Sequence, residues 1–193
     1  MSRPAETRRG QPRRARRHDP HRRERIADAA EAVIAELGIE ALTHRAVAQR
    51  ADVPLGSTTY HFASRDDLIQ VALERATDRF LAHEAGWLPP GKQEADLEGM
   101  LADRVLDYCF GDWRTRSIVC YELYLAALRR PALRATANRY NDAVAATLAG
   151  LVGPVRASAL TALLDGLSLR CLLADRAPDR RELRDLIACV LPG

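Results

Sequence analysis

The sequence predicts an all-α protein, with a small N-terminal group of helices followed by a larger helical bundle. Apolar residues recur at helical spacing through most of the chain, while the sustained alternation that marks strands is absent. Glycine and proline stand between these periodic segments. The chain has 193 residues, of which 47% are hydrophobic. It is therefore long enough to bury a core in one or two domains.

The first helix is expected from about Arg22 to Leu37. Gly38 stands where a C-terminal cap is usual. The apolar residues of this segment share one helical face: Ile26, Ala30, Val33, Ile34 and Leu37.

Thr43 is the expected N-cap of a second helix, accepting a hydrogen bond from the Arg45 or Ala46 amide. Leu42 and Val47 have the spacing of a hydrophobic staple. The run 52–54, Asp-Val-Pro, ends this helix. A short polar segment follows, over 55–61.

Ser64 opens the next helix, with Asp67 at the third position of a capping box, and the helix continues to about His83. Gly86 and the run 89–91, Pro-Pro-Gly, mark a loop and a domain boundary. Five further helices are expected near 94–111, 113–130, 132–152, 155–174 and 179–191, the last capped by Asp179.

Charge is distributed unevenly along the chain. Residues 1–25 hold ten arginines against three acidic residues, a net +7, which leaves −4 for the rest of a chain whose total is +3. Residues 1–20 have almost no apolar side chains, so we expect a disordered basic arm that meets a polyanion. A general preference for arginine is the alternative, since the chain has only one lysine, Lys92. Two domains are expected after the arm, over 21–84 and 85–193.

The spacing of the cysteines indicates the cellular compartment. Cys109, Cys120, Cys171 and Cys189 are scattered, without a CxxC pair, which argues against a zinc site or disulfide framework and suits the cytoplasm. No apolar run approaches the length of a membrane span, and no apolar region follows the basic N-terminus as in a secretory signal. We therefore expect a cytoplasmic protein with no membrane contact, no metal and no cofactor.

The polar segment 55–61 raises the question of what it faces. Two short helices joined by a tight turn, with helices packed behind them, form a helix-turn-helix unit. Val47, Ala51 and Phe62 are expected to enter its core, which turns the rest of 55–61 outward. Hydroxyl and imidazole groups there suit phosphate oxygens, and small residues allow close approach to the major groove of a duplex. A merely solvent-exposed turn is the alternative.

The stretch RERIADAAEAVIAELGIEALTHRAVAQRADVPLGSTTYHFASRDDLIQVAL resembles the DNA-binding domain of the tetracycline-repressor (TetR) family of bacterial regulators. The resemblance covers roughly Arg22 to Ala82. It rests on an ordered set of markers, from the first helical stripe through Gly38 and Leu42-Thr43 to the run 60–62, Tyr-His-Phe, and Ser64-Arg65.

The resemblance implies DNA-contacting roles for nine residues. Thr43 would cap its helix and touch a phosphate, Arg45 would read bases or backbone, and Leu55 would contact a thymine methyl. The full set is Thr43, Arg45, Leu55, Gly56, Ser57, Thr59, Tyr60, His61 and Arg65. Leu55 and Arg65 stand where family members often have lysine, Asp52 replaces a turn glycine, and Thr59 replaces a tyrosine.

The last two predicted helices point to a homodimer. Apolar residues cover most of the circumference of the segment 155–174, so it must be buried on more than one side. Gly166 inside it suggests a close interhelical contact. A four-helix interface on a two-fold axis accounts for both the apolar circumference and the glycine. Ordinary intrachain core is the alternative. The expected interface comprises Leu160, Leu163, Leu164, Gly166, Leu167, Leu183, Leu186, Ile187 and Val190.

An effector pocket in the C-terminal bundle is implied by the resemblance. Seven of the ten aromatic residues lie between positions 87 and 140, although core packing explains any one of them equally well. The candidate pocket residues are Tyr108, Trp113, Arg116, Cys120, Tyr121, Tyr124 and Asn141.

No catalytic motif is present. The run 166–170 lacks the final glycine of a nucleophile elbow, and the five histidines show no HExxH spacing. We therefore predict a DNA-binding transcriptional regulator and not an enzyme: a homodimeric repressor released from a double-stranded, inverted-repeat operator by a small-molecule effector. An effector-independent architectural DNA-binding protein is the alternative.

Overall fold

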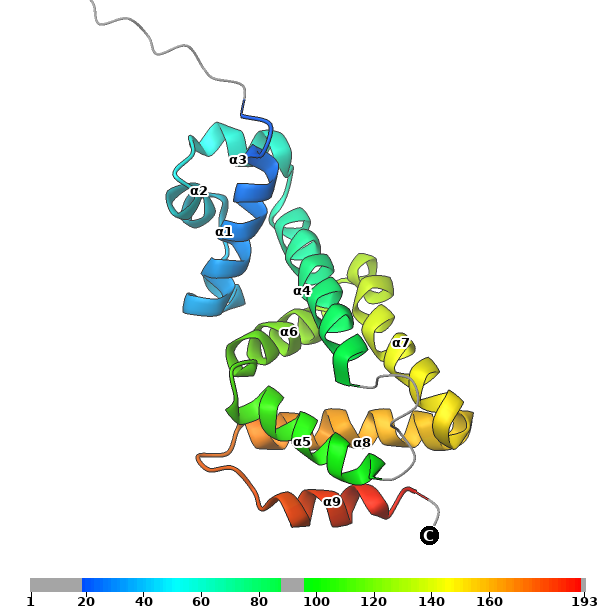
Figure 1. Ribbon diagram of the computed structural model, residues 1–193. Coiled ribbons are helices and arrows are strands. Elements are labelled where there is room, and N and C mark those ends of the chain that lie inside the picture. Colours follow the sequence, from blue (N-terminus) through cyan, green and yellow to red (C-terminus); the bar gives the residue numbers. More distant parts are fainter. Residues whose placement is uncertain (1–18, 88–95, 192–193) are drawn as a thin grey trace, which may run out of the picture.

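The computed structural model describes residues 19–87 and 96–191, and within these ranges every regular element is helical. The all-α prediction is confirmed. Figure 1 shows a small group of helices at one end, a larger bundle at the other, and α4 running between them. In the described ranges no helix is long and apolar enough to cross a membrane. Nearly all of the predicted basic arm lies outside the described residues.

The small group begins with α1 (Arg22–Leu37), the 3-10 turn η1 (Ile39–Ala41), α2 (His44–Ala51) and α3 (Leu55–His61). Gly38 ends α1 with φ of 79°, a left-handed value that favours glycine. Thr43 caps α2, because its hydroxyl accepts the Ala46 amide at 3.1 Å as predicted. Leu42 and Val47, the predicted staple pair, are both fully buried.

The long helix α4 (Arg65–Trp87) starts at a reciprocal capping box. The Asp67 amide donates to the Ser64 hydroxyl, and the Ser64 amide donates to the Asp67 carboxylate, each at 3.1 Å. The shorter aspartate thus closes the box that glutamate usually closes. The first half of α4 packs against α1, and its second half enters the larger bundle (Figure 1).

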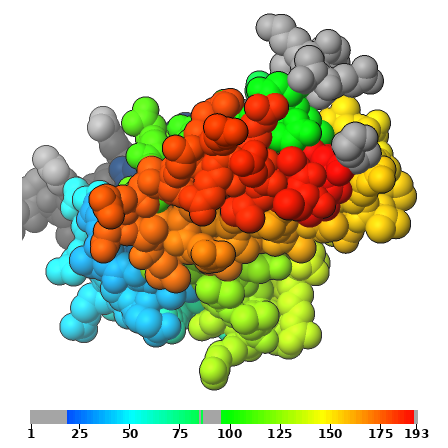
Figure 2. Space-filling model, turned by 90° about the horizontal axis from the view of Figure 1, so that it is seen from below, coloured from blue at the N-terminus to red at the C-terminus, as the bar shows by residue number. Residues whose placement is uncertain are grey.

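The larger bundle contains α5 (Leu97–Phe110), α6 (Arg114–Ala126), α7 (Arg134–Val152), α8 (Pro154–Leu172) and α9 (Arg180–Ala188). Helix α7 packs along α8, and α9 packs on α5. Asp96 and Asp179 cap α5 and α9 by accepting backbone amides. In Figure 2, α8 and α9 form much of one outer face of the molecule.

The helix predicted over 113–130 is shorter than expected. It ends at Ala126 and continues as two 3-10 turns, η2 (Ala127–Arg129) and η3 (Pro131–Leu133). Arg130 between them takes φ −129° and ψ 88°, because a following proline disfavours the helical conformation.

Two clusters of buried side chains hold the fold together. One joins α1, α2 and the first half of α4 to part of α6 and α7, and the other joins Phe80 of α4 to α5, α7, α8 and α9. Glu122 of α6 strengthens the first junction by accepting the Ile39 amide at 2.8 Å. The helices that follow α4 therefore also contact the N-terminal group, and α4 contributes to both clusters.

Candidate functional site

The turn between α2 and α3 presents α3 on the outside of the molecule. Asp52 ends α2 in the left-handed region, with φ of 51°, at the position where the family resemblance leads one to expect glycine. Pro54 then begins α3 with extended backbone. Phe62 after α3 is buried in the core, as predicted.

Most side chains of α3 point away from the core. Tyr60 is 85% exposed and Leu55 is 46% exposed, while Gly56 and Thr59 are exposed and Ser57 and His61 are half-buried. A Cβ added at Gly56 would meet nothing within 4 Å. This exposed set, Leu55, Gly56, Ser57, Thr59, Tyr60 and His61, is called the reading face below.

Thr58 corrects the prediction that the rest of the polar segment turns outward. It is fully buried, and its hydroxyl donates to the Leu55 carbonyl at 2.7 Å. The intrahelical bond satisfies the hydroxyl, so threonine serves here as a small core residue.

Thr43 and Arg45, at the start of α2, are both exposed. The phosphate contact expected of Arg65 stays a prediction, and the structure shows a role for this residue within the chain. Its guanidinium donates to the Leu42 carbonyl at 2.9 Å and to the Ile39 carbonyl at 2.7 Å. Because these nitrogens hold the η1 turn, we assign Arg65 to fixing the start of α2.

A shallow groove of about 550 Å³ lies between the start of α1 and the reading face. Asp19, Pro20 and Arg22 form one side, and Gly56, Ser57 and Tyr60 contribute to the other. The reading face is thus concave where it meets α1.

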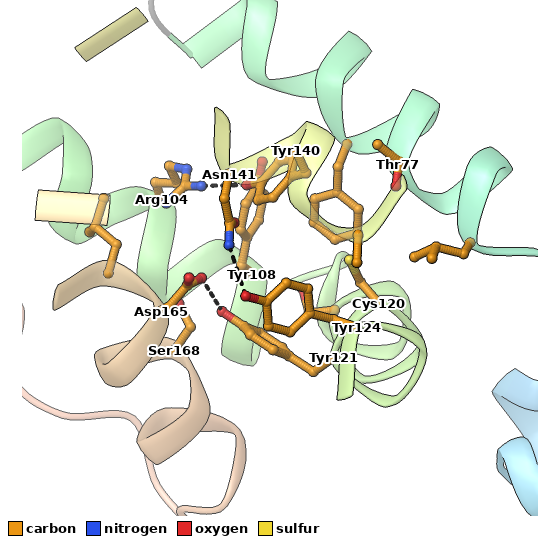
Figure 3. A pocket seen from close by; sticks show the side chains of 15 residues that line it. Thr77, Arg104, Tyr108, Cys120, Tyr121, Tyr124, Tyr140, Asn141, Asp165 and Ser168 are labelled. Carbon is orange, nitrogen blue, oxygen red and sulfur yellow. Dashed lines mark hydrogen bonds between the residues drawn. The ribbon is translucent and has the colours of Figure 1, made fainter. Parts of the chain in front are cut away.

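A second, more enclosed site lies where α4 enters the bundle. It is a cavity of about 40 Å³, which has room for only a few water molecules. Helices α4, α5, α6, α7 and α8 all contribute side chains to it (Figure 3). Its wall is mostly apolar and aromatic, and comprises Leu73, Thr77, Phe80, Arg104, Tyr108, Ser117, Cys120, Tyr121, Tyr124, Ala137, Tyr140, Asn141, Leu164, Asp165 and Ser168.

A buried polar network joins the cavity wall to the end of α4. One carboxylate oxygen of Glu84 accepts from Arg104 Nε at 2.7 Å, from the Tyr108 hydroxyl at 2.6 Å and from the Tyr140 hydroxyl at 3.0 Å. Arg104 also donates to the Tyr140 oxygen at 2.6 Å. Burial opposes the charge of Arg104, but its neighbours Tyr140, Glu84 and Tyr108 outweigh burial and raise its pKa, so Arg104 stays charged.

A different carboxylate lies on the α8 side of the cavity. Asp165 accepts a hydrogen bond from the Tyr121 hydroxyl at 3.2 Å, and Asn141 donates to the Tyr124 oxygen at 3.3 Å nearby (Figure 3). Burial raises the pKa of Asp165, although Tyr121 and Arg104 act in the opposite direction. Ser117 is only 2% exposed, and its hydroxyl has no hydrogen-bond partner in the described part of the chain.

Five of the seven predicted pocket residues line this cavity: Tyr108, Cys120, Tyr121, Tyr124 and Asn141. Trp113 lies outside the lining because its ring stacks on His83 at 3.9 Å. Arg116 faces an open cleft of about 520 Å³ between α1, α4 and α6. Neither residue therefore supports the pocket role predicted for it.

Sequence reasoning missed Glu84, Arg104, Tyr140 and Asp165. A signal was available for Arg104, which stands on the apolar face of α5 between Leu101 and Tyr108. A lone arginine among buried positions indicates a buried partner.

Cys120 is the thiol in the cavity wall. Burial raises its pKa to about 12, with a further contribution from Asp165. At neutral pH it is therefore an uncharged thiol that acts as a small apolar surface.

The predicted dimer residues divide into two groups. Leu160, Leu164, Leu167, Leu183 and Ile187 are buried in the core of the single chain, as the intrachain alternative expects. They face α5 and α7, because α8 and α9 must first cover those helices. Gly166 and Leu186 are exposed, while Leu163 and Val190 are half-buried.

An exposed helix-turn-helix beside a separate enclosed cavity is an arrangement found in helical transcriptional regulators. Residues 26–72 match the family model "Bacterial regulatory proteins, tetR family", and residues 92–193 match "Tetracyclin repressor-like, C-terminal domain". The chain belongs to the TetR family, a family of regulators and not of enzymes.

Two solved structures cover nearly the whole chain. The multidrug binding protein EbrR is 47% identical, with a TM-score of 0.79, over 91% of this chain and 97% of that one. A TetR-family member from Streptomyces coelicolor A3, SCO1917, is also 47% identical, with a TM-score of 0.79, over 90% and 100%.

A relative of known role matches over a shorter span. The transcriptional repressor KstR of Rhodococcus jostii (strain RHA1) is 36% identical over 84 residues, which is 44% of this chain. The match spans only 39% of the length of KstR.

Proposed function

We propose that this chain is a homodimeric repressor that binds an inverted-repeat operator and leaves it when a small aromatic effector enters the α4–α8 cavity. Residues 21–84 are the DNA-reading domain, and residues 85–193 form the effector-binding and dimerisation domain. The observation that carries the proposal is the contrast between an exposed polar helix, α3, and an enclosed aromatic cavity joined to it by α4.

The reading face supports a contact with duplex DNA. Tyr60 and Thr59 present hydroxyls to solvent, and His61 presents an imidazole, all of which suit phosphate oxygens. Gly56 leaves room for a groove edge to approach the backbone. Arg45 at the start of α2 is placed to reach a phosphate or a base edge beside α3.

The exposed side of α8 supports the homodimer. Val155, Ala159, Ala162, Gly166 and Leu173 follow one another at i, i+4, i+7, i+11 and i+18, and all are exposed. Val155 and Leu173 are 82% and 87% exposed, which is unusual for large aliphatic side chains. These residues are called the α8 stripe below, and the helix that carries them forms part of the outer face seen in Figure 2. Small residues at its centre suit close packing of two copies of α8 across a two-fold axis.

The cavity supports a small aromatic effector. Its walls offer the rings of Phe80 and of four tyrosines, together with a few polar groups, as ligand sites usually do. The similar protein EbrR has been solved with ethidium, malachite green and proflavin, each of which has several aromatic rings. A molecule of this kind is much larger than a cavity of about 40 Å³, so its entry must move the walls.

Helix α4 supplies the route from cavity to reading face. Leu73, Thr77 and Phe80 on α4 line the cavity, and Glu84 is held by the network with Arg104. Residues of the same helix closer to its start, Leu68 and Ile69, are fully buried against the N-terminal group. An effector that displaces Phe80 shifts α4 and the reading face with it. It shifts the equilibrium only by its different affinity for the two arrangements.

The test begins with selection of a preferred site from random duplex DNA by the purified protein, followed by titration of that site with and without malachite green, a twisted dye that does not intercalate as a flat dye does. The proposal expects a site with two-fold symmetry, bound at least about a thousandfold tighter than unrelated DNA. Malachite green is expected to weaken the complex. Equal binding of all sequences, unaffected by the dye, would instead support the architectural DNA-binding protein.

A further inference from the structure

We propose that Asp165 is the charge-selecting residue of the cavity, pairing with a positively charged nitrogen of an aromatic effector while the Ser117 hydroxyl supplies a second polar contact. The preferred effectors are then organic cations, and uncharged molecules of the same shape bind more weakly. This inference rests on the proposed effector cavity and adds to it a ligand charge and the residue that recognises it.

The charges in the cavity wall do not balance. Arg104 is the cationic side chain of the lining, and it is already paired with Glu84 at 2.7 Å. Asp165 is the acidic side chain of the lining, and in the described ranges it forms no ion pair within 4.0 Å. Once the Glu84–Arg104 pair is counted as neutral, the cavity retains one uncompensated carboxylate.

The surroundings of Asp165 favour a cationic partner. It receives one neutral hydrogen bond, from the Tyr121 hydroxyl at 3.2 Å. Burial raises the pKa of Asp165, which means that the ionised form lacks the solvation it would have in water. A positively charged nitrogen beside the carboxylate replaces that solvation. An uncharged ligand displaces water from the carboxylate without supplying an opposite charge.

Ser117 is a second, independent sign of a ligand site. Its side chain is 98% covered, it lines the cavity, and its Oγ has no hydrogen-bond partner among the described residues. Buried hydroxyls are normally bonded, so an unpaired one at a cavity wall indicates a place for a polar group of a ligand. An amino group on an aromatic ring can donate to this oxygen.

The aromatic side chains of the cavity also favour a cationic aromatic ligand. Tyr121 and Tyr124 lie near Asp165 in Figure 3, and Tyr108 and Tyr140 also line the cavity. The negative faces of such rings attract a delocalised cation as well as stacking on it. A flat cation is therefore recognised by shape and by charge in one place.

The test compares a cation with an uncharged molecule of nearly the same shape. Ethidium and 3,8-diamino-6-phenylphenanthridine, which is ethidium without its N-ethyl group and positive charge, are titrated by calorimetry into the full-length protein and into Asp165→Asn. Loss of a charged contact is expected to raise the dissociation constant of ethidium by about ten- to a hundredfold. The affinity for the uncharged compound is expected to change by less than about threefold, because it makes no such contact.

Two variants serve as controls. Asp142→Asn removes an exposed carboxylate next to the lining residue Asn141 and is expected to bind ethidium as the wild type does. Asp165→Glu keeps the charge and is expected to restore most of the ethidium affinity. The same loss in Asp142→Asn, an equal loss for both ligands, or wild-type ethidium affinity in Asp165→Asn overturns the assignment. Failure of the proposed regulatory function is distinct, since it appears in ligand-free protein as the lack of a preferred operator.

Discussion

Gly166 offers the sharpest test of the proposed dimer. It lies inside α8, at the centre of the α8 stripe, and a Cβ added there would meet nothing within 4 Å in the single chain. Nothing within one chain therefore requires glycine at this position. The perturbation is Gly166→Leu, and the matched control is Gly150→Leu, an exposed glycine on α7 that also has nothing within 4 Å.

The expected magnitude follows from this geometry. In the single chain, leucine replaces glycine at an exposed helical position and stabilises the helix by about 0.7 kcal/mol. In the dimer, each added side chain enters a packed interface, at a cost of about 1–3 kcal/mol. Two-fold symmetry introduces two of them, or about 2–6 kcal/mol per dimer. The dimer dissociation constant is then raised roughly thirtyfold to ten-thousandfold.

Sedimentation equilibrium over a range of concentrations measures that constant, and thermal unfolding checks the fold. Gly166→Leu is expected to dissociate while remaining helical, and Gly150→Leu is expected to remain dimeric. If Gly166→Leu associates as tightly as Gly150→Leu does, the α8 stripe is not the interface and the argument from exposed small residues fails.

Three further predictions concern stability. Glu84→Ala leaves Arg104 buried without its carboxylate partner. It is expected to lower the free energy of unfolding, measured by urea titration, by about 3–5 kcal/mol. A loss below about 1 kcal/mol contradicts this. Because burial raises the pKa of Asp165 above its unfolded value of about 3.9, the folded chain holds that proton more tightly and loses stability as pH rises above about 4. Asp165→Asn is therefore expected to melt higher than the wild type at pH 7, with the difference closing near pH 4; a constant difference contradicts this. Asp52→Gly removes a side chain from a left-handed backbone position and is expected to raise the free energy of unfolding by about 0.5–1 kcal/mol. An unchanged midpoint of urea unfolding contradicts this.

The local signals in the sequence predicted the helices well because each acts over a few residues. Thr43 caps α2 as expected, and the Ser64–Asp67 pair closes a capping box, since both need only neighbours along the chain. The end of α6 was placed too late, because residues 127–129 form a 3-10 turn that local signals did not indicate. The proline at 131 accounts only for Arg130, which leaves the helical region.

Contacts between distant segments were harder to predict. Arg65 has the sequence position of a phosphate ligand, yet its guanidinium reaches back 23 and 26 residues to the carbonyls of Leu42 and Ile39. The apolar stripe of α8 showed that the helix is buried on several sides without showing which side meets the same chain. Only the packing of α5, α7 and α9 separates Leu160 and Leu164 in the core from Gly166 outside.

The cavity residues show the same difference between local signals and contacts of distant segments. Tyrosines at 121 and 124 were identified because aromatic residues cluster in that part of the sequence, and both line the cavity. Glu84 and Asp165 come from helices far apart in the chain, and no local pattern relates them to Arg104 or Tyr121. Pairings of this kind depend on how helices cross, which periodicity does not specify.

Operator affinity of Tyr60→Ala, measured by fluorescence anisotropy on the selected site, tests the central claim most directly. Tyr60 is 85% exposed, so its removal is expected to leave the melting temperature and the dimer unchanged. Two lost phosphate contacts per dimer, at about 1 kcal/mol each, are expected to weaken operator binding roughly thirtyfold. Wild-type affinity in this variant would contradict the claim that the reading face of α3 binds the duplex.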